Sequence, residues 1–401
     1  MVISVETEGG TTGKVLLVGS SFSAAPIFFA LKKKKHHITV CGSDQTDPCH
    51  QYADASIFID YSDRDALLEV VTAGAYDYLV PTCNDYSYMA ATWVAAQQGF
   101  FGYDSYDTAL TLHNKVRFRA FMAEAELPAP RSVSHHAGTV VAARDLVYPL
   151  LVKPSDSFSG RGTTKIDTPG QLKAALEFAL SNTRAGSATI EEFIKGSLHS
   201  HSAFLCGQQI VQDFFVDEFC TVYPYQVNCS NHPSALCEAI RTEVRGIIGR
   251  LAARLGLADG LLHTQFMVGG GRVWIIECMR RCPGDLYGQF VGTSVAVDYA
   301  DLYIRPFLGL ELPDTLPAVT ATPMSRHSIS TATPTVVFGF SHDLPARSVR
   351  FFPLKSSGKK LNAAPYDKLA VLFAEFTSLE EMLEVTPHMD RYITFYALDR
   401  S

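Results

Sequence analysis

The first hundred residues alternate between short apolar runs and segments with helical character. The apolar runs are "KVLLVG", "HHITVCGSD" and "DYLVPTCND", which begin at Lys14, His36 and Asp77. The helix-like segments span residues 24–34, 63–73 and 86–98. Short buried strands that alternate with helices are typical of a parallel sheet covered on both faces. We therefore expect a doubly wound parallel-sheet domain over residues 1–111.

The loop after the first run argues against a nicotinamide cofactor. A dinucleotide fingerprint needs three glycines in the order G-x-G-x-x-G, whereas "GSSFSA" keeps only Gly19. The basic run "KKKKHH" (32–37) is best interpreted as a helix end, where cations complement the negative end of the helix dipole.

Composition restricts the class of protein. A chain of 401 residues exceeds one ordinary core, and its 47% hydrophobic and 19% charged residues are typical of globular domains. The net charge of −7 provides no broad basic face for nucleic acid, and the absence of a run of 18 apolar residues argues against a membrane span. "MVISVETEGGTTGK" lacks the parts of a signal peptide, and nine scattered cysteines without paired C-x-x-C spacing fit neither a disulfide framework nor zinc. We expect a cytoplasmic protein.

The middle of the chain predicts a second, mixed region. A helix is expected over 114–126, then a strand, a polar loop and a second strand within 148–166, a helix near 170–181, and a strand with a hairpin over 187–219. "EVRGIIGRLAARLGL" is an amphipathic helix, and "DGLLHTQFMVGGGRVWIIECMRR" forms two antiparallel strands joined at Gly269–Gly271. "PDTLPAVTATPMSRHSISTATPT" is interpreted as a connection to a small C-terminal α+β unit.

Three stretches carry residues suited to chemistry. In "LLVKPSDSFSGRGTTK", Lys153 follows a strand and precedes a Gly/Ser loop whose backbone N–H groups can approach phosphate oxygens. The order is not that of a P-loop, and an ordinary mobile hairpin is the alternative. In "ATIEEFIKG", Glu191 and Glu192 suit a hinge that binds a purine, with a charged strand edge as the alternative.

The third stretch is the strand pair "HTQFMV" and "VWIIECMRRCPG". In an antiparallel pair, Gln265 and Glu277 lie side by side on one face, and oxygen ligands next to a phosphate loop suit magnesium bridged to ATP. Arg280 or Arg281 then holds a second anion such as a substrate carboxylate. The alternative is a structural Glu–Arg ion pair.

The order of these motifs resembles the ATP-grasp superfamily, and within it the carboxylate–amine ligases related to biotin carboxylase and D-alanine–D-alanine ligase. "NKVRFRAFMAEAELPAP", "LLVKPSDSFSGRG", "IEEFIKG" and "VWIIECMRRCPG" follow in family order, and the resemblance covers Lys14 to Leu310. It implies a two-lobed nucleotide-binding domain over 112–310, with a small lobe near 112–190 and a large lobe near 191–310, and a small C-terminal α+β domain over 311–401.

The resemblance also implies roles for individual residues. The expected nucleotide-binding set is Lys115 at the α-phosphate, Lys153 between the α- and β-phosphates, Ser155, Ser159, Gly160 and Gly162 in the covering loop, Glu191 and Glu192 at the purine hinge, and Phe193 and Ile194 in the adenine slot. Glu277 resembles a magnesium ligand, with Gln265 beside it, and Arg281 the arginine that orients the acyl group.

This chain departs from the family pattern at three places. Gln265 stands where an acid is usual, Met279 where asparagine is usual, and "SLHSHS" where a ribose-binding glutamate is often found. His199 or His201 is a candidate substitute for that glutamate, although a solvent-facing histidine is the simpler interpretation. An amide offers oxygen without charge, so we expect weaker metal binding.

The activity implied by the resemblance is ATP-dependent formation of an amide bond through an acyl phosphate. ATP and Mg²⁺ are the expected cofactors, a small carboxylate and an amine, such as amino acids, the expected substrates, and a homodimer the family-based expectation. Two alternatives stay open: a carboxylase-like relative that uses bicarbonate or another small acid, and a nucleotide-binding protein without turnover. Tyr287, Phe290 and the stretch Phe219–Cys229 are candidate pocket residues, with core packing as the alternative.

Overall fold

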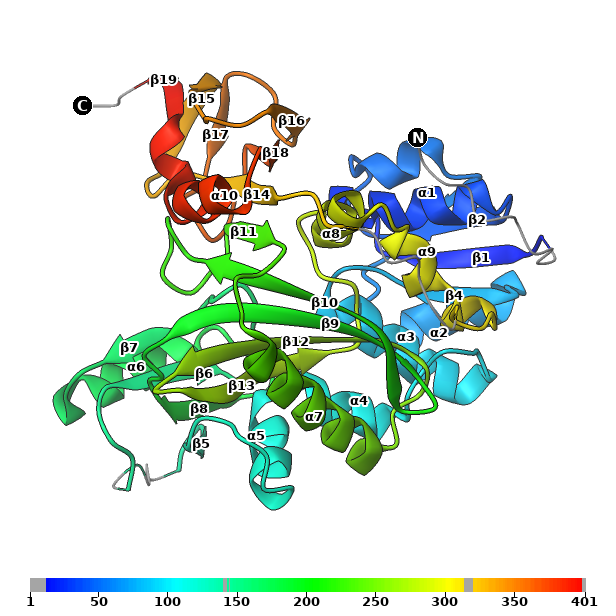
Figure 1. Cartoon of the computed structure of the whole chain (residues 1–401). Helices are drawn as coiled ribbons and strands as arrows, with labels where there is room; N and C mark the ends of the chain where they lie inside the picture. Colours follow the sequence, from blue (N-terminus) through cyan, green and yellow to red (C-terminus); the bar gives the residue numbers. More distant parts are fainter. Residues whose placement is uncertain (1–11, 140–142, 144, 314–319, 399–401) are drawn as a thin grey trace.

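The structure is a computed structural model that describes residues 12–139, 143, 145–313 and 320–398 (Figure 1). Residues 1–11, which make up most of the N-terminal stretch that was compared with a signal peptide, lie outside the described residues. Residues 314–319 of the expected connection also lie outside them. In the part of the chain that is described, no helix has both the length and the apolar character needed to cross a membrane.

The N-terminal region forms the parallel sheet that the sequence predicts. Its strands lie in the order β3-β2-β1-β4, and all of its pairings are parallel. The elements are β1 (Lys14–Val18), α1 (Ala25–Lys33), β2 (His37–Cys41), β3 (Ala55–Ile57), α2 (Arg64–Gly74), β4 (Tyr78–Pro81), α3 (Asp85–Gln98) and α4 (Tyr106–His113). Connections leave β1 on both sides, so its carboxyl end and that of β4 form a topological switch point, where such sheets bind ligands.

The small lobe has a four-stranded antiparallel sheet in the order β5-β8-β6-β7. Asn114 caps the helix that leads into the lobe, because its side chain accepts from the backbone N–H groups of Val116 and Arg117. The elements are α5 (Lys115–Glu124), β5 (Ser132–His136), β6 (Leu150–Pro154), β7 (Thr164–Ile166), α6 (Leu172–Leu180) and β8 (Ser187–Glu192). The expected strand–loop–strand around Lys153 is therefore confirmed.

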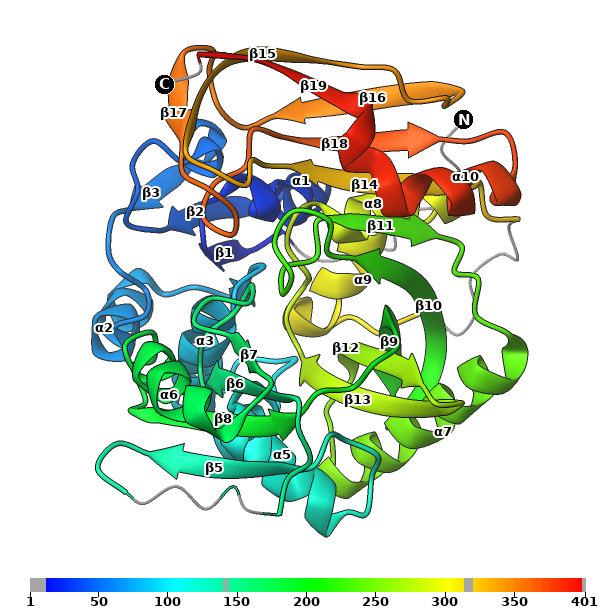
Figure 2. The ribbon, with the colours of Figure 1, turned by 90° about the vertical axis from the view of Figure 1, so that its left-hand side faces the viewer.

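A long curved sheet of eight strands dominates the rest of the molecule (Figures 1 and 2). Its order is β13-β12-β9-β10-β11-β14-β18-β16. The strands are β9 (Ser197–Cys206), β10 (Gln209–Phe219), β11 (Cys229–His232), β12 (Gly260–Gly269), β13 (Arg272–Met279), β14 (Met324–Ile329), β16 (Ser348–Pro353) and β18 (Ala370–Glu375). The amphipathic helix α7 (Glu238–Leu255) packs Val244, Ile248 and Leu251 against one face of this sheet. The other face of the sheet is left open for a site.

The C-terminal region continues this sheet, and here one expectation was wrong. The segment interpreted as a connection contains β14, whose six residues are all buried. Four of them are polar, so the strand lacks the apolar alternation by which it would be recognised. The remaining elements are α8 (Tyr287–Val295), α9 (Tyr299–Ile304), β15 (Thr335–His342), β17 (Lys359–Leu361), α10 (Leu379–Val385), β19 (Ile393–Leu398) and the 3-10 turns η1 (Phe22–Ala24), η2 (Pro48–Tyr52), η3 (Pro169–Gln171), η4 (Pro306–Leu308) and η5 (Thr386–Tyr392). The domain boundaries at 111 and 310 stay predictions.

Candidate active site

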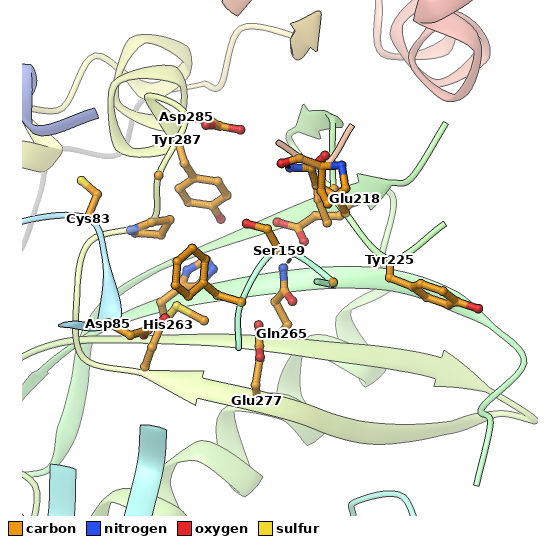
Figure 3. Close-up of a pocket in the computed structure, with 18 of the residues that line it drawn as sticks. Cys83, Asp85, Ser159, Glu218, Tyr225, His263, Gln265, Glu277, Asp285 and Tyr287 are labelled. Carbon is orange, nitrogen blue, oxygen red and sulfur yellow. Dashed lines mark hydrogen bonds between the residues drawn. The ribbon is translucent and has the colours of Figure 1, made fainter. Parts of the chain in front are cut away.

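One large cavity, of about 2360 Å³, lies where the parallel sheet, both lobes and the C-terminal region meet. Figure 3 shows that its wall includes side chains from the open face of β12 and β13 and from the loops after β4 and β13. The sequence-predicted residues that line it are Lys115, Lys153, Ser159, Gly160, Phe193, Gln265, Glu277 and Arg281. Residues more than 160 positions apart therefore share one space.

Lys153 reaches this cavity from β6 and is held there by an acid. Its Nζ lies 2.8 Å from Glu191 Oε2, and Arg119 Nε lies 3.1 Å from Glu191 Oε1. Burial raises the pKa of Glu191, but Arg119 and Lys153 outweigh burial and bring it to about 2. Glu191 is only 1% exposed, so its carboxylate is committed to the two cations. This geometry favours a role in positioning Lys153 over the expected contact with a purine amine.

Four other expected nucleotide ligands do not line the cavity. Glu192 accepts from Val147 N at 3.0 Å and lies 3.4 Å from Arg131, while Ile194 packs beside Gly269. The Ser155 hydroxyl is buried and accepts from Ser187 Oγ at 2.8 Å. The side of Gly162 that would carry a Cβ faces Pro154 and Asn182. Their expected roles therefore depend on backbone atoms and stay predictions.

The Gly/Ser loop closes over the cavity toward Lys115. The Lys115 ammonium, at the start of α5, donates to Ser157 O at 2.6 Å. Gly160 has φ +70°, and a Cβ there would lie 2.5 Å from Tyr225 O, so the loop touches the segment after β10 at a point where only glycine fits. The loop is thus packed on the opposite wall, as a covering hairpin requires.

The register of the β12–β13 hairpin confirms that Gln265 and Glu277 are direct neighbours. The Lys115 ammonium lies 4.0 Å from Glu277 Oε2, and Gln265 Nε2 donates to Glu218 Oε2 at 2.9 Å. These oxygen donors fit Mg²⁺ by their chemistry. The described residues contain no cluster of three or more His, Cys, Asp or Glu side chains arranged to hold a metal, so a metal here would need oxygens from ATP.

The two arginines after β13 have different positions. Arg280 is buried against Asp104, with Nε 2.8 Å from Oδ2, and donates to the carbonyls of Ala258 and Leu261. Arg281 lines the cavity and forms a bidentate ion pair with Asp85, with Nε–Oδ1 at 3.0 Å and Nη2–Oδ2 at 3.3 Å. Burial raises the pKa of Asp85, but Arg281 and then His113 outweigh burial and hold it below its usual range. Arg281 is therefore the arginine that can meet a substrate anion.

The histidines of "SLHSHS" are both buried, so the interpretation as a solvent-facing side chain was wrong. His199 lines the cavity, with Nδ1 2.8 Å from Asp217 Oδ1 and Nε2 2.7 Å from Ser197 Oγ. His201 is 0% exposed and its Nε2 lies 2.9 Å from Asp213 Oδ2. Of these two histidines, only His199 is therefore placed to meet a ligand in the cavity.

Sequence reasoning missed several residues of the cavity wall. Glu218, Asp285 and Arg326 line it, and Lys368 Nζ lies 2.5 Å from Asp285 Oδ2. Burial raises the pKa of Glu218. In "DFFVDEF", Asp217 and Glu218 directly follow three apolar residues, and this pattern could have indicated that Glu218 lies in a pocket. Tyr287 and seven residues of the stretch Phe219–Cys229 do line the cavity, whereas Phe290 is a core residue at 0% exposure.

Comparison with known proteins finds similar ATP-binding domains and similar enzymes. Residues 114–209 match the family model described as carbamoyl-phosphate synthase L chain, ATP binding domain. The formate-dependent phosphoribosylglycinamide formyltransferase of Synechococcus sp. (strain WH7803) is 28% identical over 311 residues, 75% of this chain and 77% of that protein. The enzyme of the same name from Saccharolobus solfataricus is 24% identical over 92% of this chain and 94% of its own length.

Solved structures share the fold over almost the whole chain. An L-amino acid ligase from Bacillus licheniformis matches with a TM-score of 0.81, at 15% identity, over 96% of this chain and 99% of its own. A phosphoribosylglycinamide synthetase from Anaerococcus prevotii matches with a TM-score of 0.75, at 13% identity and the same coverage. The chain therefore has the ATP-grasp fold of these solved structures, and its residues 114–209 are similar to the ATP-binding domain of carbamoyl-phosphate synthase.

Proposed function

We propose that this chain is an ATP-dependent ligase that joins a small carboxylate to an amine through an acyl phosphate, with release of ADP and phosphate. The observation that carries the proposal is the shared cavity, in which Lys115, Lys153 and Glu277 surround a space continuous with Arg281. The relatives support it, because formate-dependent formyltransferases and an L-amino acid ligase are named for reactions of small carboxylic acids.

ATP lies between the two lobes in this proposal. Phe193 lines the adenine slot, and the ammonium groups of Lys115 and Lys153 offset the charge of the phosphates. Glu191 keeps Lys153 aimed at them through the 2.8 Å ion pair. His199, whose tautomer is set by Asp217, faces the cavity where a ribose hydroxyl would be bound.

Gln265 and Glu277 are the residues that would hold the magnesium ion of ATP. Bound there, the ion supplies positive charge against the phosphate oxygens. The chain offers one carboxylate and one amide at these two positions, so a bound ion would take its other ligands from ATP and water.

Arg281 orients the carboxylate that attacks the γ-phosphorus. Asp85 occupies one edge of its guanidinium and the Cys282 carbonyl accepts from Nη1 at 3.3 Å, which leaves one N–H group on each of Nη1 and Nη2 for the substrate. The attack forms a C–O–P linkage and releases ADP, and the amine then attacks the acyl carbon and expels phosphate. The loop at Ser159 and Gly160 covers the cavity and excludes water, which would hydrolyse the acyl phosphate. A homodimer stays a prediction based on the family resemblance.

ADP release tests this proposal. The purified chain with Mg-ATP is supplied with formate or single amino acids as the acid, and with amino acids or phosphoribosylglycinamide as the amine. Product mass spectrometry identifies the amide. Release that requires both an acid and an amine is expected, and Lys153→Met should abolish it, whereas Lys173→Met, an exposed lysine on α6, should not. Bicarbonate-dependent release would instead indicate a carboxylase-like enzyme, and nucleotide binding without release a protein without turnover.

A further inference from the structure

We propose that Glu218 is a positioning residue of the magnesium site, which orients the Gln265 amide and supplies the negative charge that an amide lacks. This inference rests on the proposed function, in which Gln265 and Glu277 hold the metal of ATP. It assigns a role to an acid at the cavity that none of the motifs includes.

Glu218 lies on the same face of the sheet as the two metal candidates, diagonally across from Gln265. On adjacent strands, Glu277 of β13 pairs with Gln265 of β12, and Gln265 pairs with Ser200 of β9. On β10, Val216 pairs with Ser200, and Glu218 is two residues further along, paired with Leu198, so its side chain points to the same face as that of Val216. Figure 3 shows Glu218, Gln265 and Glu277 along the open face of the sheet, all lining the cavity.

The hydrogen bond between Glu218 and Gln265 decides which amide atom is available. Gln265 Nε2 donates to Glu218 Oε2 at 2.9 Å, because a carboxylate accepts and only the amide nitrogen can donate. The planar amide then turns Oε1 away from Glu218, as Figure 3 shows. That oxygen is the atom that a magnesium ion requires. Without Glu218, the amide is free to rotate and present its nitrogen.

Charge provides a second argument. Glu218 is 4% exposed, and a carboxylate this deeply buried is costly unless positive charge compensates it. Arg326 provides part of that charge, but its guanidinium also serves Ser230 Oγ at 2.7 Å and Asp285 O at 3.2 Å. A divalent ion at Gln265 and Glu277 would compensate Glu218 further. Glu218 thus restores, from two strands away, the charge lost by having glutamine at position 265.

The test separates metal binding from activity. Mn²⁺ binding is measured by electron paramagnetic resonance, and ADP affinity by calorimetry with and without Mg²⁺. Glu218→Gln should weaken metal binding about 10–100-fold, the usual effect of losing a residue that orients a metal ligand. ADP affinity without metal should not change. The matched control Glu243→Gln, on the exposed side of α7, should leave both measurements unchanged.

A double variant provides the decisive comparison. Glu218→Gln with Gln265→Glu reverses the hydrogen bond and moves the carboxylate onto the metal-facing residue, so it conserves both the contact and the charge. We expect wild-type metal affinity or tighter, and this variant carries the test if Glu218→Gln alone does not fold. Unchanged metal binding in Glu218→Gln, or no recovery in the double variant, overturns the inference. If the ADP affinity of the wild-type protein does not depend on Mg²⁺, that result would instead contradict the proposed function itself.

Discussion

Neutralising Glu191 should expose how much free energy its ion pairs contribute. The Glu191 carboxylate is 1% exposed and serves both Arg119 and Lys153, which hold its pKa at about 2 against an ordinary 4.5. At 1.36 kcal/mol for each pKa unit, this difference corresponds to about 3 kcal/mol of stability. That agrees with the roughly 3–5 kcal/mol lost when one partner of a buried pair is removed. Glu191→Gln should therefore lower the free energy of unfolding by about 3 kcal/mol at pH 7.

The pH dependence gives this prediction a sign that can be checked. Because the folded-state pKa is lowered, the stabilisation is complete above the unfolded pKa near 4.5 and is lost as the pH falls toward 2. Urea unfolding of wild type and Glu191→Gln, measured from pH 7 down to pH 3, should show the difference shrinking below pH 4.5. The exposed control Glu177→Gln should show none. A difference that is absent at pH 7, or equally large at pH 3, would refute the reasoning.

Three further predictions follow from the cavity wall. Arg281→Ala should lower kcat/KM by roughly 100–1000-fold, on the scale of one lost oxyanion donor; steady-state kinetics of ADP release check this, and an effect below threefold would contradict it. Asp85→Asn should raise KM for the acid more than KM for ATP, because it frees Arg281 to move; equal changes would argue against a positioning role. Gly160→Ala should raise KM for ATP, because its Cβ would clash with Tyr225 O at 2.5 Å, and an unchanged KM would mean that the loop does not close there.

Local patterns in the sequence were sufficient to predict the strands that surround the site. The apolar run at Lys14 predicted the parallel sheet, and the glycine turn at Gly269–Gly271 fixed the register that pairs Gln265 with Glu277. Both depend on neighbours in the chain or on a short hairpin, which a pattern of residues can encode. The predicted fold class is confirmed by the solved structures.

The missing parts depend on contacts between distant residues. Arg281 meets Asp85, which is 196 positions away, and Glu191 meets Arg119, 72 positions away. No periodicity announces such pairs, so Glu191 was assigned to the purine. Strand β14 was missed because its side chains are mostly polar, and Ser325, Arg326 and Ser328 are buried with hydrogen bonds to partners distant in the sequence. Burial that is satisfied by hydrogen bonds has no hydrophobic signature.

A structure of the protein with Mg-ADP tests the central claim most directly. The account predicts that the diphosphate lies between the ammonium groups of Lys115 and Lys153, with the metal at Glu277 and the adenine against Phe193. A nucleotide bound outside this cavity, or phosphates out of reach of both lysines, would contradict it.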